Sequence, residues 1–201
     1  REMNWMNYLG RPMLKEKGFD PIAPNGTGIA SAGTLVGVVY NSDMVKGADI
    51  PKNLADTLKP KWKGKIASTP YAAGMREFAM PDLLGTKTMT AYTHKLSDQI
   101  GGLMRCGSMN KITSGEFLML VLSCGDQYVN QAHRKKEPLG YALMNEAVVS
   151  HTRYGSVPVN SQSPNAGALF VVWLHSKEGQ KWMWDNVGLD LHVYPESHQR
   201  K

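Results

Sequence analysis

The sequence SGEFLMLVLSCGDQYVNQAHRKKEPLGYAL, residues 114–143, contains a strand, a helix and a second strand in succession. The apolar run at 117–123 predicts a buried strand, and the spacing of apolar residues after it predicts a helix over about 126–136. A weaker strand is predicted at 139–143. Alternation of this kind is typical of an α/β fold with a largely parallel sheet.

The same alternation extends over most of the chain. Further strands are predicted at 33–40, 65–67, 103–105 and 148–154, and further helices at 88–100, 164–174 and 176–185. The helix at 164–174 has Ser163 and Pro164 at its N-cap and first positions, where these residue types are favoured. Apolar residues between Trp5 and Leu14 indicate one more amphipathic helix near the start.

The composition is that of an ordinary globular protein and excludes some classes of partner. The chain has 201 residues and a formal net charge of +6, but most of its basic residues are scattered. The group Lys59 to Lys65 alternates with Pro60, Trp62 and Gly64, which is typical of a solvated loop and disfavours nucleic-acid binding. No apolar run approaches the roughly 18 residues that a membrane span requires.

Three predicted strands run directly into turn-forming and capping residues. The junctions are Ser68-Thr69-Pro70, Cys106-Gly107-Ser108 and Cys124-Gly125-Asp126. In a parallel sheet all three lie at the carboxyl edge of the strands, where ligands of open α/β sheets bind. Helices beginning there, the first with Thr69 as N-cap and Pro70 as first residue, would favour an anion. Helix capping alone would also explain each residue.

Cys106 and Cys124 are the only cysteines in the sequence. If 108–115 is a crossover helix, the strands on either side of it are neighbours in the sheet, and the two cysteines come within reach of each other. An even cysteine count favours a disulfide, which would place the protein in an oxidising compartment. The alternative is a pair of buried free thiols.

The sequence lacks the motifs of well-characterised enzyme classes. The sequence has no GxSxG, GxxxxGK[ST], HExxH or GxGxxG pattern, and its histidines lack metal-ligand spacing. A cysteine nucleophile with His133 or His151 as base is the remaining enzymatic hypothesis. We therefore predict that the chain is not an enzyme, and we expect neither a cofactor nor a resident metal.

Three segments resemble bacterial ABC-transporter solute-binding proteins of the ferric-iron-binding type. They are YNSDMVKGADIPKNLADTLKPKWKGKIAS (40–68), the segment 114–143 quoted above, and SPNAGALFVVWLHSKEGQKW (163–182). The PKWKGKI element of the first and the SKEGQ element of the third are especially similar to that family. The resemblance covers most of the chain from about Asn25 onward.

The resemblance implies a type II periplasmic binding protein fold. Such a fold has two lobes, each with a central, mostly parallel sheet flanked by helices. By this mapping, 1–40 is the end of lobe one and a crossover strand, 41–153 is lobe two, and 154–201 returns to lobe one. The first lobe is expected to be incomplete, because members of that family begin with a strand-rich first lobe that this sequence does not contain.

The function implied by the resemblance is capture of a solute in a cleft between the lobes, without chemistry on it. The solute would be a small anion, an organic acid or a ferric complex, delivered to an ABC permease in the membrane. The location would be periplasmic or extracellular. The alternative is a ligand-sensing effector domain of a regulator with the same fold.

The resemblance also implies ligand-binding residues. The family's anion-contacting turn corresponds to Ser68, Thr69 and Tyr71. Ferric-binding relatives use two adjacent tyrosines on the helix after the buried strand, where this sequence has only Tyr128. Coordination of a bare ferric ion by phenolates is therefore not expected, although Tyr128 remains a candidate for a hydrogen bond to the ligand.

Arginine side chains are the other candidates for an anionic ligand. A guanidinium group suits two-pronged contacts with carboxylate or phosphate. Arg76, Arg105 and Arg153 are the candidates, and Arg105 is preferred because it directly precedes Cys106 at the predicted strand edge.

Overall fold

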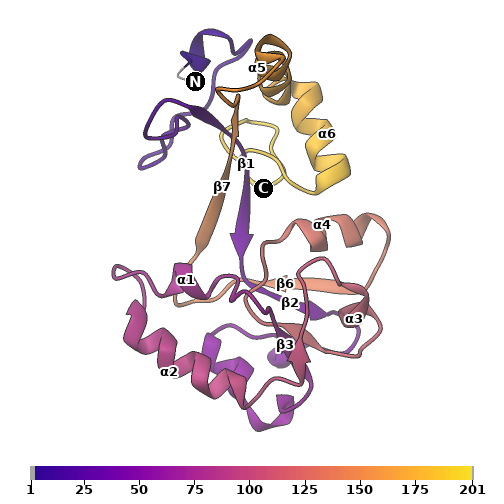
Figure 1. The fold of residues 1–201 in the computed structure, drawn as a ribbon. Helices are drawn as coiled ribbons and strands as arrows, with labels where there is room; N and C mark the ends of the chain where they lie inside the picture. The colour runs from indigo at the N-terminus through magenta and orange to yellow at the C-terminus, as the bar shows by residue number, and fades with distance from the viewer. Residues whose placement is uncertain (1–2, 201) are drawn as a thin grey trace. The chain divides into compact units, whose positions relative to one another are not determined.

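The computed structural model of the protein describes residues 3–200 (Figure 1). The chain forms two compact units. Unit 1 consists of 1–34 and 151–201, and unit 2 consists of 35–150. Each unit has hydrophobic clusters of its own, so each is described separately.

Unit 2 is built on a five-stranded sheet with the order β4-β3-β5-β2-β6. Its strands are β2 (Val38–Asn41), β3 (Ile66–Ser68), β4 (Gly102–Leu103), β5 (Met119–Leu120) and β6 (Leu139–Ala142). The strand β3 is parallel to β4 and β5, whereas β2 is antiparallel to both β5 and β6. Of these five strands, β2 alone is therefore reversed. The sheet is mixed, and the predicted α/β class is confirmed.

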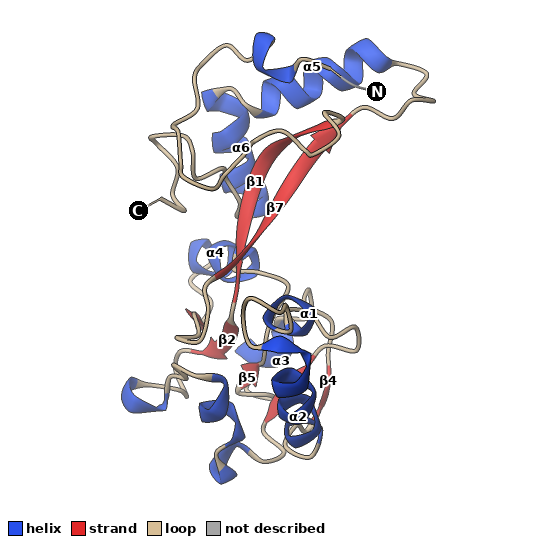
Figure 2. Ribbon diagram, turned by 90° about the vertical axis from the view of Figure 1, so that its left-hand side faces the viewer, coloured by secondary structure: helices blue, strands red, loops and turns tan. Residues whose placement is uncertain are grey.

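Helices cover both faces of this sheet (Figure 2). They are α1 (Met75–Phe78), α2 (Gly85–Ser97), α3 (Asn110–Thr113) and α4 (Gln127–Arg134), with 3₁₀ turns at Gly47–Asp49, Leu54–Leu58 and Pro60–Trp62. Neighbouring strand residues point to opposite faces. Val38 thus joins a cluster with Phe78 of α1, while Val39 joins a cluster with Ile112 of α3 and Val129 of α4.

The predicted strands at 33–40 and 117–123 differ from the observed ones. The first is two strands, β1 (Gly28–Val36) and β2, separated at Gly37. A Cβ at Gly37 would lie 2.4 Å from the Ala142 carbonyl oxygen, so only glycine fits at this position. The second keeps only Met119–Leu120 as strand, because Leu122 takes a left-handed φ of 54°. The prediction identified buried residues correctly but made the strand too long.

Unit 1 contains most of a two-stranded sheet, β1 with β7 (Val149–Ser156), and the helices α5 (Pro164–Leu174) and α6 (Lys177–Val187). Ser163 and Pro164 begin α5 as predicted. A Cβ at Gly179 would lie 2.1 Å from the Trp173 carbonyl oxygen, so the tight corner between the helices requires glycine. The amphipathic helix predicted near the start is wrong. Only a 3₁₀ turn, Trp5–Asn7, forms there, since Pro12 cannot donate within a helix.

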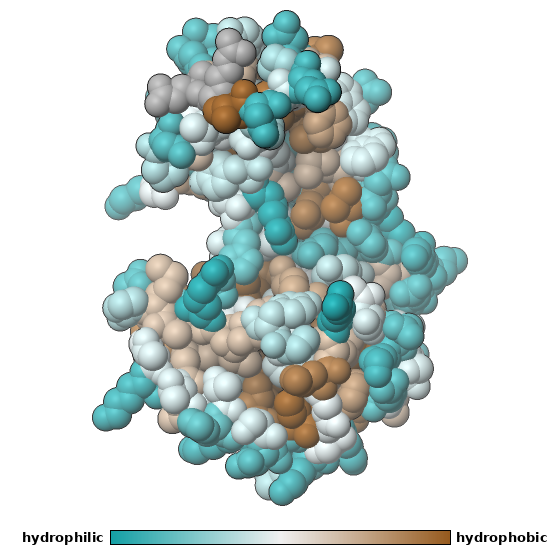
Figure 3. All heavy atoms as spheres, in the orientation of Figure 1, coloured by the Kyte–Doolittle hydropathy of each residue, from teal (hydrophilic) through white to brown (hydrophobic). Residues whose placement is uncertain are grey.

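The surface of unit 1 exposes several large apolar side chains on α5 and α6. Phe170 stacks on Trp173 with ring centroids 5.8 Å apart, and Trp173 lies 6.0 Å from Trp182. On the face drawn in Figure 3, hydrophobic atoms gather in small groups among hydrophilic ones. Among residues 3–200, no helix combines the length and apolar character needed to cross a membrane.

A buried hydrogen bond on α2 gives a first test of the core of unit 2. The Tyr92 hydroxyl lies 2.8 Å from Thr57 Oγ1, which also donates to the Leu54 carbonyl. Burial raises the pKa of Tyr92 above its ordinary value, so the phenol stays neutral. We expect Tyr92→Phe to lower the free energy of unfolding by about 1 kcal/mol in a urea titration. Tyr8→Phe, at an exposed ring, is the control and should unfold like the wild type.

Candidate ligand-binding site

The loops that follow β3, β4 and β5 meet at the carboxyl edge of the sheet in unit 2. Parallel pairing places Ser68 beside Leu103, and Ala67 beside Leu120, so the three strands end close together. The Met104 N–H donates to the Ser68 carbonyl at 2.9 Å, which ties the loop after β4 to the end of β3. Three segments distant in sequence thus reach one edge.

The loop after β3 is a tight turn and not the start of a helix. The Thr69 hydroxyl oxygen accepts a hydrogen bond from the Ala73 N–H at 2.8 Å. The prediction that Thr69 caps a helix starting at Pro70 is wrong, because α1 begins only at Met75. Gly74, just before it, has a left-handed φ of 74°, and a Cβ there would lie 2.7 Å from a core side chain. Ser68 and Thr69 are both buried in this turn.

The other two predicted capping residues, Ser108 and Asp126, also do not cap a helix through their side chains. Ser108 precedes α3 by two residues and is not its N-cap. Asp126 directly precedes α4, but its carboxylate makes no capping bond to that helix. It accepts instead from the Leu35 N–H at 3.0 Å and from the Asn130 amide at 3.1 Å. Asp126 therefore fixes the start of α4 against the segment that enters β2.

Cys106 and Cys124 form a disulfide, as predicted, with their Cα atoms 5.9 Å apart. The reason given for the prediction was wrong in one respect, because β3 lies between β4 and β5 in the sheet. Strands two positions apart are separated by about 9–10 Å. The loops after β4 and β5 must therefore converge, and the disulfide crosses the carboxyl end of β3.

Tyr71 connects the turn after β3 to this disulfide. Its hydroxyl oxygen accepts a hydrogen bond from the Cys106 N–H at 2.9 Å, and it lies 3.7 Å from Cys124 Sγ. The side chain is 52% exposed, so the ring borders solvent. The hydroxyl hydrogen takes no part in the bond from the Cys106 N–H.

Arg105 lies in the middle of the same arrangement. Its two neighbours are both anchored to the turn after β3, Met104 through the Ser68 carbonyl and Cys106 through the Tyr71 hydroxyl. The Arg105 side chain is exposed. The structure thus brings Ser68, Thr69, Tyr71 and Arg105 to one edge of the sheet.

The other predicted residues are on other elements. Arg76 is on α1, where its exposed guanidinium pairs with Glu77 at 2.7 Å. Arg153 is an exposed residue of β7 in unit 1. Tyr128 is half-buried on α4 and lines a pocket of about 260 Å³, whose other walls include Gly107, Asn110 and Lys135.

Comparison with known proteins identifies the family. Residues 14–189 match the family of bacterial extracellular solute-binding proteins. The chain belongs to this family. A curated relative, the Fe(3+)-binding periplasmic protein of Serratia marcescens, is 22% identical over 174 residues, which are 83% of this chain and 51% of the relative. The chain thus spans about half of that relative's length.

Solved structures agree with this assignment. The ferric binding protein from Campylobacter jejuni matches with a TM-score of 0.71 at 16% identity, over 94% of this chain and 63% of that one. The periplasmic binding protein AfuA from Actinobacillus pleuropneumoniae, with fructose-6-phosphate bound, matches with a TM-score of 0.69 at 19% identity, over 89% and 63%. These likenesses confirm the predicted type II periplasmic binding fold. The family is one of solute-binding proteins and not of enzymes, in agreement with the sequence-based prediction.

Two residues of this solute-binding chain that make buried hydrogen bonds in unit 2 were missed from sequence. The buried Asn41 amide donates to the Ile112 carbonyl at 2.8 Å, and its oxygen accepts from the Asp43 N–H at 3.0 Å. The Tyr141 hydroxyl donates to the Leu35 carbonyl, and burial raises the pKa of this phenol above its ordinary value. A polar residue at the end of an apolar strand pointed to Asn41, whereas no local sequence pattern pointed to Tyr141.

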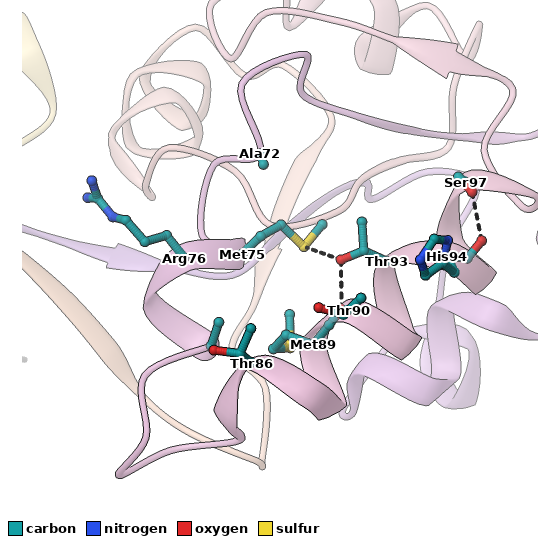
Figure 4. A pocket seen from close by; sticks show the side chains of 10 residues that line it. Ala72, Met75, Arg76, Thr86, Met89, Thr90, Thr93, His94 and Ser97 are labelled. Atoms are coloured by element: carbon teal, nitrogen blue, oxygen red, sulfur yellow. Dashed lines mark hydrogen bonds between the residues drawn. The ribbon is translucent and has the colours of Figure 1, made fainter.

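A larger hollow lies between α1 and α2, with a volume of about 490 Å³. Met75 and Met89 lie along it, and the Thr93 hydroxyl is bonded to the Met89 carbonyl at 2.8 Å (Figure 4). The Arg76 guanidinium extends away from the other lining side chains (Figure 4). The hollow therefore offers apolar and hydroxyl groups without a charged group directed into it. Within residues 3–200, no cluster of three or more histidine, cysteine or carboxylate side chains could hold a metal ion.

Proposed function

We propose that this chain is part of the extracytoplasmic solute-binding component of an ABC importer. In this proposal the carboxyl edge of β3, β4 and β5 binds a small anion, an organic acid or a ferric complex. The permease of the importer receives the solute, and the protein acts in the periplasm or outside the cell. The family assignment supports the coarse role, and the ligand class rests on the residues at the edge.

The single observation that carries the ligand class is the anchoring of Arg105. Hydrogen bonds from Met104 and Cys106 hold the backbone on both sides of it to the turn that contains Ser68 and Tyr71. A guanidinium held on a fixed backbone loses less freedom when it binds, and its planar fork matches carboxylate and phosphate oxygens.

The arrangement supports binding without chemistry. Cys106 and Cys124 are joined in a disulfide, so neither sulfur is available as the nucleophile of a cysteine-dependent enzyme. His133, which could have served as a base, lies with Nε2 2.7 Å from the Leu139 carbonyl and links α4 to β6. The site therefore fits capture and release of an unmodified solute.

The test is thermal unfolding of the full chain with orthophosphate, sulfate, citrate and ferric citrate. A probe at a hundredfold excess over its Kd adds about 2.7 kcal/mol to the stability of the native state and raises the midpoint. We expect at least one probe to do so. We expect Arg105→Ala to weaken its binding at least tenfold, since a charged hydrogen-bond partner contributes about 1.5–3 kcal/mol.

Arg76→Ala is the matched control, because it removes an exposed arginine of the same unit whose guanidinium is already paired with Glu77. It should leave the affinity unchanged. Equal losses in the two variants would mean that only the general positive charge attracts the probe. No shift with any probe would contradict the proposed ligand class and favour the alternative of a ligand-sensing domain in a regulator.

A further inference from the structure

Three side chains connect the loops after β3, β4 and β5 at the carboxyl edge, and they belong to Tyr71, Cys106 and Cys124. The Tyr71 hydroxyl reaches the loop after β4 through the Cys106 N–H, and the disulfide continues from there to the loop after β5. We call these three residues the clamp. Its hydrogen-bonding group is a phenol on a half-exposed ring, and its covalent part is a bond that a thiol can break.

The clamp holds two loops closer together than the spacing of their strands in the sheet. β4 and β5 flank β3, so their ends are separated by about 9–10 Å. The Cα atoms of Cys106 and Cys124 are nevertheless only 5.9 Å apart. No backbone ladder joins these two loops directly, because β3 lies between their strands. The disulfide is therefore what holds them together over the turn that contains Ser68 and Thr69.

Arg105 depends on this closure. It immediately precedes Cys106, whose N–H is bonded to Tyr71 and whose sulfur is bonded to Cys124. If the loop after β4 is released, the Cys106 N–H loses its fixed partner, and Arg105 becomes free to sample other positions. A binding group that must first be ordered binds more weakly, because ordering it takes free energy from association.

We propose that the clamp positions Arg105 and the turn after β3 for the ligand, and that reduction of its disulfide by a dithiol weakens anion binding. This inference rests on the proposed function. It assigns Tyr71 a positioning role, in which its hydroxyl acts on the ligand through Cys106 and Arg105. The clamp makes the affinity of the site responsive to the thiol–disulfide state of its surroundings.

The chemistry is thiol–disulfide exchange with the dithiol as two-electron reductant. Cys124 is partly exposed and Cys106 is buried, so the attacking thiolate reaches the Cys124 sulfur. The bond between the two protein sulfurs breaks, and Cys106 leaves as a thiolate whose charge the Cys124 N–H, 3.0 Å from it, can stabilise. The second thiol of the reagent then closes its own disulfide. Cys106 and Cys124 end as thiols, and the dithiol ends as a cyclic disulfide.

The first measurement is amide hydrogen exchange of the full chain, oxidised and after reduction with dithiothreitol. We expect the amides of 104–108 and 122–125 to exchange at least tenfold faster after reduction. The amides of α2 should keep their protection and so report that unit 2 remains folded. Unchanged exchange in both loops would overturn the inference, whether or not any ligand binds.

The second measurement is calorimetric titration with the probe that gives the largest thermal shift among orthophosphate, sulfate, citrate and ferric citrate. We expect reduction, Tyr71→Phe and the double variant Cys106→Ala/Cys124→Ala each to weaken binding about tenfold. Tyr71→Phe combined with the double variant should weaken it little further, since residues that act through one unit are not additive. Tyr92→Phe, which lowers stability without touching the edge, should bind like the wild type.

The two measurements separate the possible failures. Faster loop exchange with unchanged affinity would overturn the positioning role. Equal weakening by Tyr92→Phe would also overturn it, because the losses would then follow stability alone. If no probe binds the oxidised wild type, the proposed ligand class fails, and loop exchange still decides whether the clamp exists.

Discussion

Replacing both cysteines by alanine is expected to lower the free energy of unfolding by about 3 kcal/mol, because the disulfide closes a loop of intermediate length. The bonded residues are separated by 18 positions in sequence. Without the bond, the unfolded chain gains the freedom that this loop had lost, whereas the folded chain gains less, because only the loops at the carboxyl edge are released. Urea unfolding of Cys106→Ala/Cys124→Ala against the wild type measures the difference.

Reduction of the wild type provides the control for side-chain packing. Cys106 is buried against the cluster that contains Met109 and Ile112, and alanine leaves a small space there. The reduced wild type keeps both sulfur atoms and should lose nearly as much stability as the double variant. A reduced wild type as stable as the oxidised protein would contradict the prediction and assign any loss in the variant to packing.

Local sequence patterns predicted the longer helices of this fold well. The helix α5 starts at Pro164 and ends at Leu174, as predicted, because Ser163, Pro164 and the apolar residues after them all favour the same structure. The helix α2 was predicted at 88–100 and occurs at Gly85–Ser97. Helices follow from interactions within a few residues, and these are visible in the sequence.

The strands were less predictable, since their limits depend on partners distant in sequence. Apolar residues at 117–123 are mostly buried, but only Met119–Leu120 pair as a strand. The order of the strands, with β3 between β4 and β5, is also absent from any local pattern. The disulfide was therefore predicted correctly from residue types while the sheet order behind the prediction was not.

For the candidate site, the sequence likewise predicted residues but not the contacts between distant segments. Sequence placed Ser68 and Thr69 after one strand end and Arg105 at another, and the structure brings them to one edge because those strands are parallel. The hydrogen bond from the Cys106 N–H to the Tyr71 hydroxyl could not be predicted, because it depends on how two loops converge. Helix capping, the alternative explanation of the three junctions, fails at each of them.

Unit 1 contains a buried histidine that should make the stability of the protein depend on pH. Burial, and then the charge of Arg11, lower the pKa of His175 from 6.5 to about 4. The ring is 1% exposed. Its Nδ1 lies 2.9 Å from the Tyr194 hydroxyl, and its Nε2 lies 3.3 Å from Ser31 Oγ. Burial raises the pKa of Tyr194 to about 12, so this phenol keeps its proton.

These contacts suit the neutral ring. Ser31 donates its hydroxyl proton to the Ile29 carbonyl at 3.2 Å, which leaves its oxygen to accept from Nε2–H. Nδ1 is then free to accept from Tyr194. A second proton on the ring would require the Tyr194 hydroxyl to change from donor to acceptor, and it would bring a positive charge close to Arg11, whose Nε donates to the His175 carbonyl at 2.7 Å. Glu196, paired with Arg11, offsets part of that charge.

The pKa of His175 is lower in the folded state than in the unfolded state, so the unfolded state binds more protons between about pH 6.5 and pH 4. Stability from this group is therefore complete above pH 6.5 and is lost as the pH falls toward 4. The loss amounts to about 3 kcal/mol, at 1.36 kcal/mol for each unit of pKa difference. Tryptophan fluorescence in urea at a series of pH values measures it, and four of the five tryptophans lie in unit 1.

The variant His175→Gln removes the titration and should unfold with a flatter pH dependence across this window. Its stability at pH 7 should be lower, because glutamine cannot meet both Tyr194 and Ser31, but its further loss at pH 4 should be smaller than that of the wild type. His94→Gln, at an exposed position of α2, should keep the full pH slope of the wild type. If His175→Gln and the wild type lose the same free energy between pH 6.5 and pH 4, the slope comes from carboxylates, and the buried imidazole is not its cause.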